Sequence, residues 1–315
     1  MTRHKTLVLA FGGNAITRQG QRGTFPEQLE NIELSCRDVV ELARLGYGLV
    51  ITHGNGPQVG SILIKNELAK DVLPPMPLDV CVANTQGSLG FGISQALQNM
   101  LLKAGVRREV AALITRVRVD PGDEAFTHPT KPVGPFFSRE EAEAQVKAKR
   151  YVMREDSGRG WRRVVPSPRP QEILEGRVIR QLLEQGVIVV AAGGGGIPVV
   201  RGEEGYRGVE AVIDKDLAAL RLALDVGASG FVILTGVPKV CLNFGQPNQQ
   251  ALERITASRA EEYLKAGQFP PGSMGPKIEA VSEFVKHTGG TAVITDPANL
   301  QAALRGENGT RLVPG

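Results

Sequence analysis

The sequence predicts an α/β fold in which a mostly parallel sheet is covered by helices on both faces. Continuous Val, Ile and Leu runs, such as TLVLAF at 6–11 and VIVVAA at 187–192, are typical of strands buried on both sides. Amphipathic segments with helical spacing separate these runs, which is the pattern of a parallel sheet. The chain of 315 residues is long enough for one large domain or for two ordinary ones. The alternation pauses at 117–166, where we expect a small inserted subdomain.

The elements before this pause follow one another regularly. In order, they are a strand at 6–11 that ends at Gly12-Gly13, a helix from Pro26 to Gly46, a strand with a glycine turn and a helix start over GLVITHGNGPQVG at 48–60, a helix at 78–103 and a strand at 110–119. The first helix is indicated by apolar residues that recur at helical spacing and by the glycine that stops it.

The inserted segment is rich in charge, proline and glycine. Its part YVMREDSGRGWRRVV at 151–165 predicts a β-hairpin, because alternating residues flank a turn that contains glycine. The regular pattern resumes afterwards. It predicts a helix at 170–186, a strand at 187–192 followed by Gly193 to Gly196, a helix from Asp214 to Val226, a strand at 230–236, helices near 256–266 and from Pro276 to His287, a strand at 291–295, a short helix, and a last strand near 310–313.

Composition narrows the function classes. With 42% hydrophobic and 22% charged residues, the chain resembles an ordinary soluble globular protein, and we expect no membrane partner because no apolar run is long enough to span one. Cys36, Cys81 and Cys241 lie far apart, which favours buried cysteines in a reducing cytoplasm over a disulfide framework or a zinc site. The basic segment 147–169 has few aromatic residues among its charges, so we expect a solvated hairpin and no nucleic-acid partner.

Glycine-rich turns follow several of the predicted strands. They are Gly12-Gly13-Asn14, His53-Gly54-Asn55-Gly56, Gly193 to Gly196 and, more loosely, the loop before Asp214. Glycine lets backbone N–H groups approach an anion, and a following helix N-terminus adds positive potential. Ligands of open parallel sheets bind beyond the carboxyl ends of the strands. The turns therefore predict a phosphate-binding surface, although the P-loop pattern is absent and the dinucleotide fingerprint is incomplete.

Three lysines stand where positive charge would serve phosphate chemistry. Lys131 lies in THPTKPVGPFF, where prolines stiffen the chain around it. Lys215 and Lys277 occupy predicted helix starts, a position that is mildly unfavourable for a cation unless an anion binds there too. Phosphoryl transfer requires mainly positioning and electrostatic stabilisation. The three lysines and the glycine turns together predict a phosphotransferase.

The motifs resemble those of carbamate kinase, a family within the amino-acid kinase superfamily. The matching segments, in order, are FGGNA, VITHGNGPQVG, ANTQGSLGF, PTKPVGPFF, VVPSPRP, AAGGGGIPV, VIDKDLAA, LNFGQPNQ and GSMGPKIEA, and they extend from about residue 6 to 313. The resemblance implies a single domain over 1–315 with an open three-layer αβα sandwich. It places the carbamate and phosphoryl site in about 1–190, the nucleotide site in about 191–315, and a mobile protruding subdomain at 117–166.

The resemblance also implies a chemistry. It implies reversible transfer between ADP with carbamoyl phosphate and ATP with carbamate, with Mg²⁺ held mainly by the phosphates, in a cytoplasmic homodimer that serves arginine breakdown. Carried over by motif, Gly12, Gly13, Asn14, Gly54 and Asn55 form the anion site for carbamate and the transferred group. Lys131 acts from the inserted subdomain, and Lys215 and Lys277 hold the nucleotide phosphates. Asp216 orients the lysines, Asp214 lies near the nucleotide and its metal, and Gly194, Gly195, Met274 and Gly275 bind the nucleotide.

Departures from related patterns leave alternatives open. Ala10 stands where relatives such as acetylglutamate kinase have a catalytic lysine, and the Lys131 loop is a sensible replacement for that charge. Gly236 and Cys241 differ from the usual carbamate kinase residues in the nucleotide half, so nucleotide preference stays open. Two other functions remain: a superfamily kinase that phosphorylates another carboxylate, and a regulatory module that binds nucleotide or carbamoyl phosphate without turnover.

Overall fold

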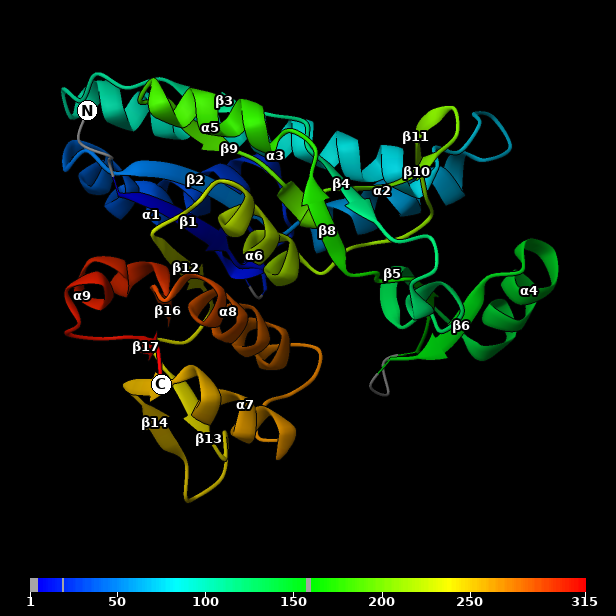
Figure 1. The fold of residues 1–315 in the computed structure, drawn as a ribbon. Coiled ribbons are helices and arrows are strands. Elements are labelled where there is room, and N and C mark those ends of the chain that lie inside the picture. Colours follow the sequence, from blue (N-terminus) through cyan, green and yellow to red (C-terminus); the bar gives the residue numbers. More distant parts are fainter. Residues whose placement is uncertain (1–4, 19, 157–159) are drawn as a thin grey trace.

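A central sheet of eight strands organises the computed structural model, which describes residues 5–18, 20–156 and 160–315. Its order is β15 (Arg254–Thr256), β17 (Thr310–Val313), β16 (Thr291–Thr295), β12 (Gly230–Leu234), β1 (Thr6–Phe11), β2 (Gly48–His53), β9 (Ile188–Val190) and β3 (Val110–Ala112) (Figure 1). All neighbours are parallel except β16 and β17. In the described part of the chain, no helix is both long and apolar enough to cross a membrane.

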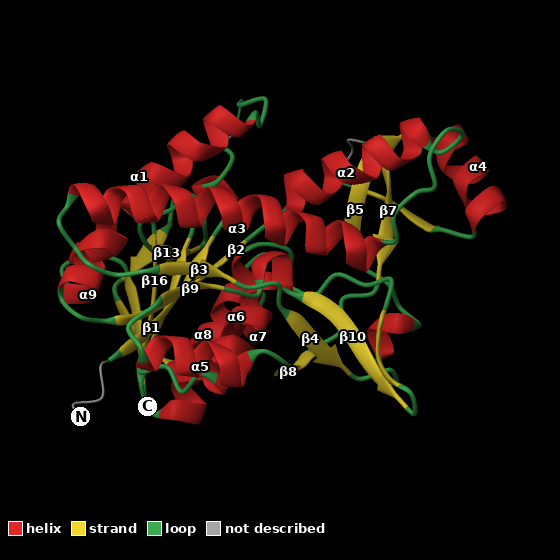
Figure 2. Cartoon of the chain, turned by 90° about the horizontal axis from the view of Figure 1, so that it is seen from above, coloured by secondary structure: helices red, strands yellow, loops and turns green. Residues whose placement is uncertain are grey.

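Helices cover both faces of this sheet (Figure 2). On one face lie α1 (Phe25–Arg44), α3 (Leu78–Lys103) and α9 (Leu300–Arg305); on the other lie α5 (Gly176–Glu184), α6 (Lys215–Asp225), α7 (Ala257–Lys265) and α8 (Met274–Thr288). Alternate residues of β1 show the division, because Leu7 and Leu9 join the core under α1 and α3 while Val8 joins the core under α6 and α8. The predicted three-layer α/β architecture is confirmed.

Two predicted elements are wrong in their extent. The helix predicted at 170–186 begins only at Gly176, because β8 (Pro170–Ile173) is a strand that pairs antiparallel with β4 (Arg116–Val119). The strand predicted at 110–119 divides into β3 and β4, which belong to different sheets. β4 lies in a second sheet of order β11 (Gly205–Gly208), β10 (Ile197–Gly202), β4, β8. Pairing with distant segments decides these boundaries, and local periodicity does not contain that information.

The inserted segment forms a sheet of its own. Its strands are β5 (Lys131–Phe137), β7 (Trp161–Val165) and β6 (Val152–Glu155), with α4 (Arg139–Lys149) between β5 and β6 in the chain. The predicted hairpin is confirmed by the antiparallel pairing of β6 with β7, and residues 157–159 of its turn lie outside the described residues. β5 lies against α2 (Gly56–Ala69) (Figure 1). A further two-stranded ribbon joins β13 (Val240–Leu242) to β14 (Gln250–Leu252).

Candidate active site

The turns after β1 and β2 lie side by side at the carboxyl edge of the central sheet. The Gly54 N–H donates to Phe11 O at 3.1 Å, and the Gly12 N–H donates to Leu234 O at 2.8 Å. A Cβ on Gly12 would lie 2.7 Å from Leu234 O, so the turn requires glycine there. Gly13 begins a short 3-10 turn with Asn14, whose side chain lies outside the described part of the structure.

The turn after β9 packs directly onto the turn after β2. Asn55 precedes the first residue of α2, and its side-chain amide donates to Thr85 Oγ1 at 2.8 Å. Gly194 has a φ of +67°, and a Cβ there would overlap the Asn55 amide. Gly195, at φ +93°, leaves no room for a Cβ beside Ile213 O, directly before Asp214. The glycines thus bring the predicted anion site against the loop that precedes α6.

His53 is buried beneath these turns. Its exposed fraction is 1%, and its Nδ1 donates to Gly54 O at 3.0 Å. A Cβ on Gly193 would overlap the imidazole ring, so this glycine is required by packing. Burial lowers the pKa of His53 to about 4, and the ring is neutral near pH 7. His53 therefore supports the turns as a neutral hydrogen-bond donor.

A buried carboxylate joins two of the predicted lysines. Asp216 is 2% exposed, and its two oxygens accept from Lys215 Nζ at 2.6 Å and from Lys277 Nζ at 2.9 Å. Burial opposes ionisation of Asp216, but the charges of the two lysines hold its pKa below the ordinary value. Burial and the nearby Lys215 charge lower the pKa of Lys277. The aliphatic part of Lys215 passes over Gly54, where a Cβ would lie 3.3 Å from Lys215 Cδ.

The third predicted lysine arrives from the inserted segment. Lys131 Nζ donates to Asp214 Oδ2 at 2.8 Å across 83 residues of chain. The other oxygen of Asp214 accepts from the Asp216 N–H at 2.9 Å and so caps the N-terminus of α6. The structure therefore brings Lys131, Lys215 and Lys277 to the same two carboxylates, beside the glycine turns.

Comparison with known proteins shows the family of this chain. The model of the amino acid kinase family matches residues 5–296. The chain belongs to this family. Among individual members, it is 45% identical to the carbamate kinase of Pyrococcus horikoshii and 46% identical to that of Thermococcus kodakarensis, in each case over 98% of this chain and 99% of the relative. A structure of the Giardia lamblia carbamate kinase bound to AMP-PNP matches with a TM-score of 0.94 and 42% identity, over 100% of both chains.

These findings confirm the resemblance inferred from the motifs, and with it an enzyme that is a kinase. Within the described ranges, no group of three or more His, Cys, Asp or Glu side chains is placed to hold a metal ion. Mg²⁺ commonly binds one or two carboxylates and otherwise substrate phosphates and water. Asp214 fits such a role better than Asp216, because it is paired with one lysine and is 16% exposed, whereas Asp216 is buried between two lysines.

Met274 and Gly275 lie at the start of α8, one turn before Lys277. The Gly275 N–H donates to Pro270 O at 2.9 Å, and Met274 packs against the core under α6 and α8. They lie near the site because Lys277, in the same first turn of α8, contacts Asp216. Their role in nucleotide binding, like that of Gly194 and Gly195, stays a prediction.

Sequence reasoning missed two polar residues of α3 that hold the turns in place. Thr85 accepts from Asn55, as described above, and its neighbour Gln86 donates to Gly193 O at 3.0 Å. Gln86 also accepts from the Thr115 N–H at 2.8 Å. Both side chains are buried. Two adjacent polar residues within the otherwise buried face of a long helix are a signal that could have found them.

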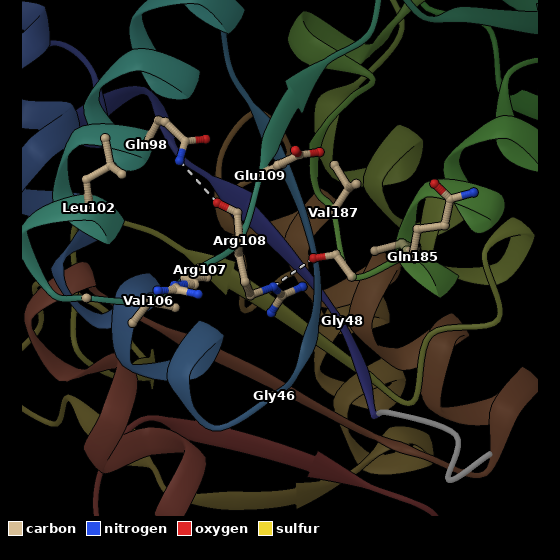
Figure 3. A pocket seen from close by; sticks show the side chains of 13 residues that line it. Gly46, Gly48, Gln98, Leu102, Val106, Arg107, Arg108, Glu109, Gln185 and Val187 are labelled. Atoms are coloured by element: carbon tan, nitrogen blue, oxygen red, sulfur yellow. Dashed lines mark hydrogen bonds between the residues drawn. The ribbon is translucent and has the colours of Figure 1, made fainter.

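A cavity of about 970 Å³, whose lining residues are shown in Figure 3, lies at the end of the strands opposite the glycine turns. Gly48, at the start of β2, and Val187, directly before β9, line it, whereas the glycine turns follow the carboxyl ends of the same strands. Arg108 in its wall donates to Gly186 O at 2.7 Å and to Tyr47 O at 2.5 Å, so this cation is bound by backbone carbonyl groups. The lysine cluster, where charge and glycine turns coincide, is therefore the candidate active site.

Proposed function

We propose that this enzyme is a carbamate kinase that catalyses reversible phosphoryl transfer between carbamoyl phosphate and ADP. The observation that carries the proposal is the ion pair of Lys131 with Asp214, because it brings a cation from the inserted segment to the Lys215–Asp216–Lys277 cluster. The first strand offers no lysine at this place, since Ala10 is apolar and buried. The carbamate kinases of P. horikoshii and T. kodakarensis, which align over nearly the whole chain, support the same substrate.

The reaction balances without a proton-transfer step. An oxygen of the terminal ADP phosphate attacks phosphorus, the bond from phosphorus to the carbamoyl oxygen breaks, and its electron pair remains on carbamate. Carbamate is an anion, so neither direction requires a general base, and the neutral buried His53 is not needed as one. The protein must bring two anions together, which calls for positive charge and backbone N–H groups.

The proposed roles follow the geometry of the cluster. Gly12, Gly13, Asn14, Gly54 and Asn55 bind carbamate and the transferred group. Lys131 leaves Asp214 and contacts the transferred group. Lys215 and Lys277, which are oriented by Asp216, hold the nucleotide phosphates. The turn at Gly194 and Gly195 and the start of α8 at Met274 and Gly275 also bind the nucleotide. Asp214 would be the carboxylate that holds Mg²⁺, and the ion would reduce the negative charge of the phosphates.

We propose that these roles divide the chain as the motifs suggest, with the phosphoryl site in about 1–190, the nucleotide site in about 191–315, and a mobile segment at 117–166. The setting proposed with them is a cytoplasmic homodimer that forms ATP during arginine breakdown. Buried Cys36 and Cys81 are compatible with a reducing compartment. Sedimentation velocity tests the dimer, since a single species with the mass of one chain would contradict it.

ATP formation from ADP, Mg²⁺ and carbamoyl phosphate tests the proposed reaction. We expect a turnover of about 1 per second or more, as is typical of kinases, and its loss when Mg²⁺ is omitted. No ATP from a folded protein that binds ADP would refute the proposal. Turnover with acetyl phosphate or with an acidic amino acid and ATP would then favour another carboxylate kinase, and ADP binding without any turnover would favour a regulatory module.

A further inference from the structure

The inserted β-ribbon, formed by β5 and β7, packs one face against the main body, which is the rest of the described chain outside 117–166. The register pairs Lys131 with Val165 and Val133 with Arg163, so these four side chains share a face. Val133 and Val165 are buried in an apolar cluster with residues of α2, α3 and β10, such as Val59. The two cations flank this apolar pair diagonally, with Lys131 on the side of the active site.

Arg163 is tied to the main body through Glu210. Its Nη2 lies 2.6 Å from Glu210 Oε2, and its side chain is only 17% exposed. The guanidinium group also stacks on the Tyr151 ring at 4.0 Å, which fixes its plane. The other oxygen of Glu210 accepts from the Leu78 N–H at 2.8 Å, at the first residue of α3. Glu210 is therefore anchored on the body and holds a cation of the inserted segment.

The segment that contains Glu210 also contains the partner of Lys131. Asp214 follows Glu210 by four residues, and between them the Val212 N–H donates to Pro166 O at 2.9 Å. The inserted ribbon and residues 210–214 are thus joined by an ion pair at each end and a backbone hydrogen bond in the middle. Arg163 lies on β7 two residues before Val165, the residue that is paired with Lys131 on β5.

The packing between the inserted segment and α2 leaves a cavity. A cavity of about 630 Å³ lies between the inserted segment and α2, and Val133, Arg163 and Glu210 are among the residues that line it. The apolar contacts of Val133 and Val165 are therefore confined to one part of this side, and Arg163 and Glu210 form an ion pair at the wall of the cavity. A second tie, Lys149 Nζ to Glu67 Oε2 at 2.5 Å, lies on the far side of the same cavity, on α4 and α2.

We propose that Arg163 and Glu210 are positioning residues that hold Lys131 over the reaction centre. This inference rests on the proposed function, since it takes Lys131 as the cation that contacts the transferred group. A misplacement of about 1 Å can lower a rate about a hundredfold, so a tie that fixes the ribbon within that tolerance has a kinetic effect. Arg163 does not touch substrate, and it acts only through the strand that carries Lys131.

The test uses Arg163→Gln and Glu210→Gln. The glutamine at 210 keeps an oxygen that can accept from the Leu78 N–H but loses the charge that binds Arg163. Arg139→Gln is the matched control, because Arg139 pairs with Glu143 inside α4 and both side chains are exposed, at 79% and 61%. We expect Arg163→Gln and Glu210→Gln each to lower kcat about tenfold with KM for ADP nearly unchanged. Arg163→Lys should lower kcat less than Arg163→Gln does. Wild-type kcat in both variants would refute the proposal.

A positioning role predicts that the effect depends on Lys131. In a Lys131→Ala background, Arg163→Gln should change the residual kcat less than about twofold, because contacting groups are not additive. A tenfold loss in that background would show a general structural effect and overturn the inference.

Hydrogen exchange gives a readout that needs no turnover. The Val212 amide should exchange faster in Arg163→Gln than in wild type and Arg139→Gln. If wild type forms no ATP, the proposed function fails. The exchange measurement still tests whether the Arg163–Glu210 ion pair holds the ribbon on residues 210–214. Unchanged exchange would overturn it.

Discussion

Lys277 Nζ donates to Asp216 Oδ2 at 2.9 Å, although 61 residues separate the two in the sequence. This contact joins the first turn of α8 to the first turn of α6. Since Lys215 donates to the other oxygen of the same carboxylate, one buried anion determines the direction of two ammonium groups. Asp216 is therefore the centre of the nucleotide side of the proposed active site.

Replacing Asp216 by Asn should impair both stability and nucleotide binding. The change leaves two cations beside a neutral buried amide, and breaking a buried ion pair costs about 3 kcal/mol or more. We expect a lower urea midpoint and a KM for ADP raised at least about tenfold, because the lysines lose their common partner. Glu253→Gln is the control, as Glu253 is exposed and pairs with Lys239 on the surface, and its midpoint should hardly change. An Asp216→Asn protein with wild-type KM would contradict the orienting role.

Replacing Lys131 by Ala should separate catalysis from nucleotide binding. Lys131 contacts only Asp214 in the cluster, whereas Lys215 lies on the nucleotide side with Asp216. We expect Lys131→Ala to lower kcat about a hundredfold or more, with KM for ADP within about threefold of wild type, as for loss of a charge used in the transition state. Lys215→Ala should raise KM and lower kcat together. Steady-state kinetics of both variants decide this, and equal turnover of Lys131→Ala and wild type would reject the role.

Adding one methyl group at Gly194 should disrupt the site. The φ of +67° is unfavourable for alanine, and the new Cβ would overlap the Asn55 amide, which must then leave Thr85. We expect a kcat lowered at least about tenfold, since the turn would be displaced by close to 1 Å. Gly186→Ala is the control, because its φ is +82° but nothing lies within 4 Å of the new Cβ. That variant should lose about 1–2 kcal/mol of stability and keep its kcat.

His53 should make the protein sensitive to mild acid. Its pKa falls from 6.5 to about 4 on folding, so the unfolded chain binds the proton more tightly. The resulting stability, about 3 kcal/mol, is complete above pH 6.5 and is lost as the pH falls towards 4. His53→Asn keeps a donor for Gly54 O and does not titrate. Between pH 7 and 5, its unfolding free energy should fall less than that of wild type; parallel curves would show that His53 does not titrate as stated.

The sequence was sufficient for the parts of the fold and site that rest on local pattern. The alternation of buried strands and amphipathic helices predicted the layers, and the glycine turns and Lys131, Lys215 and Lys277 were found from their positions in loops and at helix starts. What local pattern could not supply was pairing over distance. The separation of β3 from β4 and the strand β8 depend on partners far along the chain.

Ion pairs and hydrogen bonds between distant side chains could not be predicted for the same reason. The prediction of a solvated hairpin for the basic segment 147–169 is wrong for Arg163, whose largely buried side chain pairs with Glu210 at 2.6 Å; Arg169 is exposed as predicted and pairs with Glu279 at 2.7 Å. A run of charge in a sequence does not show that its counter-charges lie 47 and 110 residues away. Thr85 and Gln86 lie within the matching segment ANTQGSLGF, but the sequence does not show that their partners are Asn55, Gly193 and Thr115.

The chain leaves the second sheet at Val119 and returns at Pro170, and these two residues are paired neighbours on β4 and β8. The segment between them, which includes Lys131, therefore starts and ends at neighbouring positions at one end of these two strands. Insertions are tolerated best where their ends lie close together. The segment that supplies this charge could therefore be lengthened, exchanged or lost in the course of evolution without interrupting the central sheet, and a related enzyme could acquire a different acceptor by the same route.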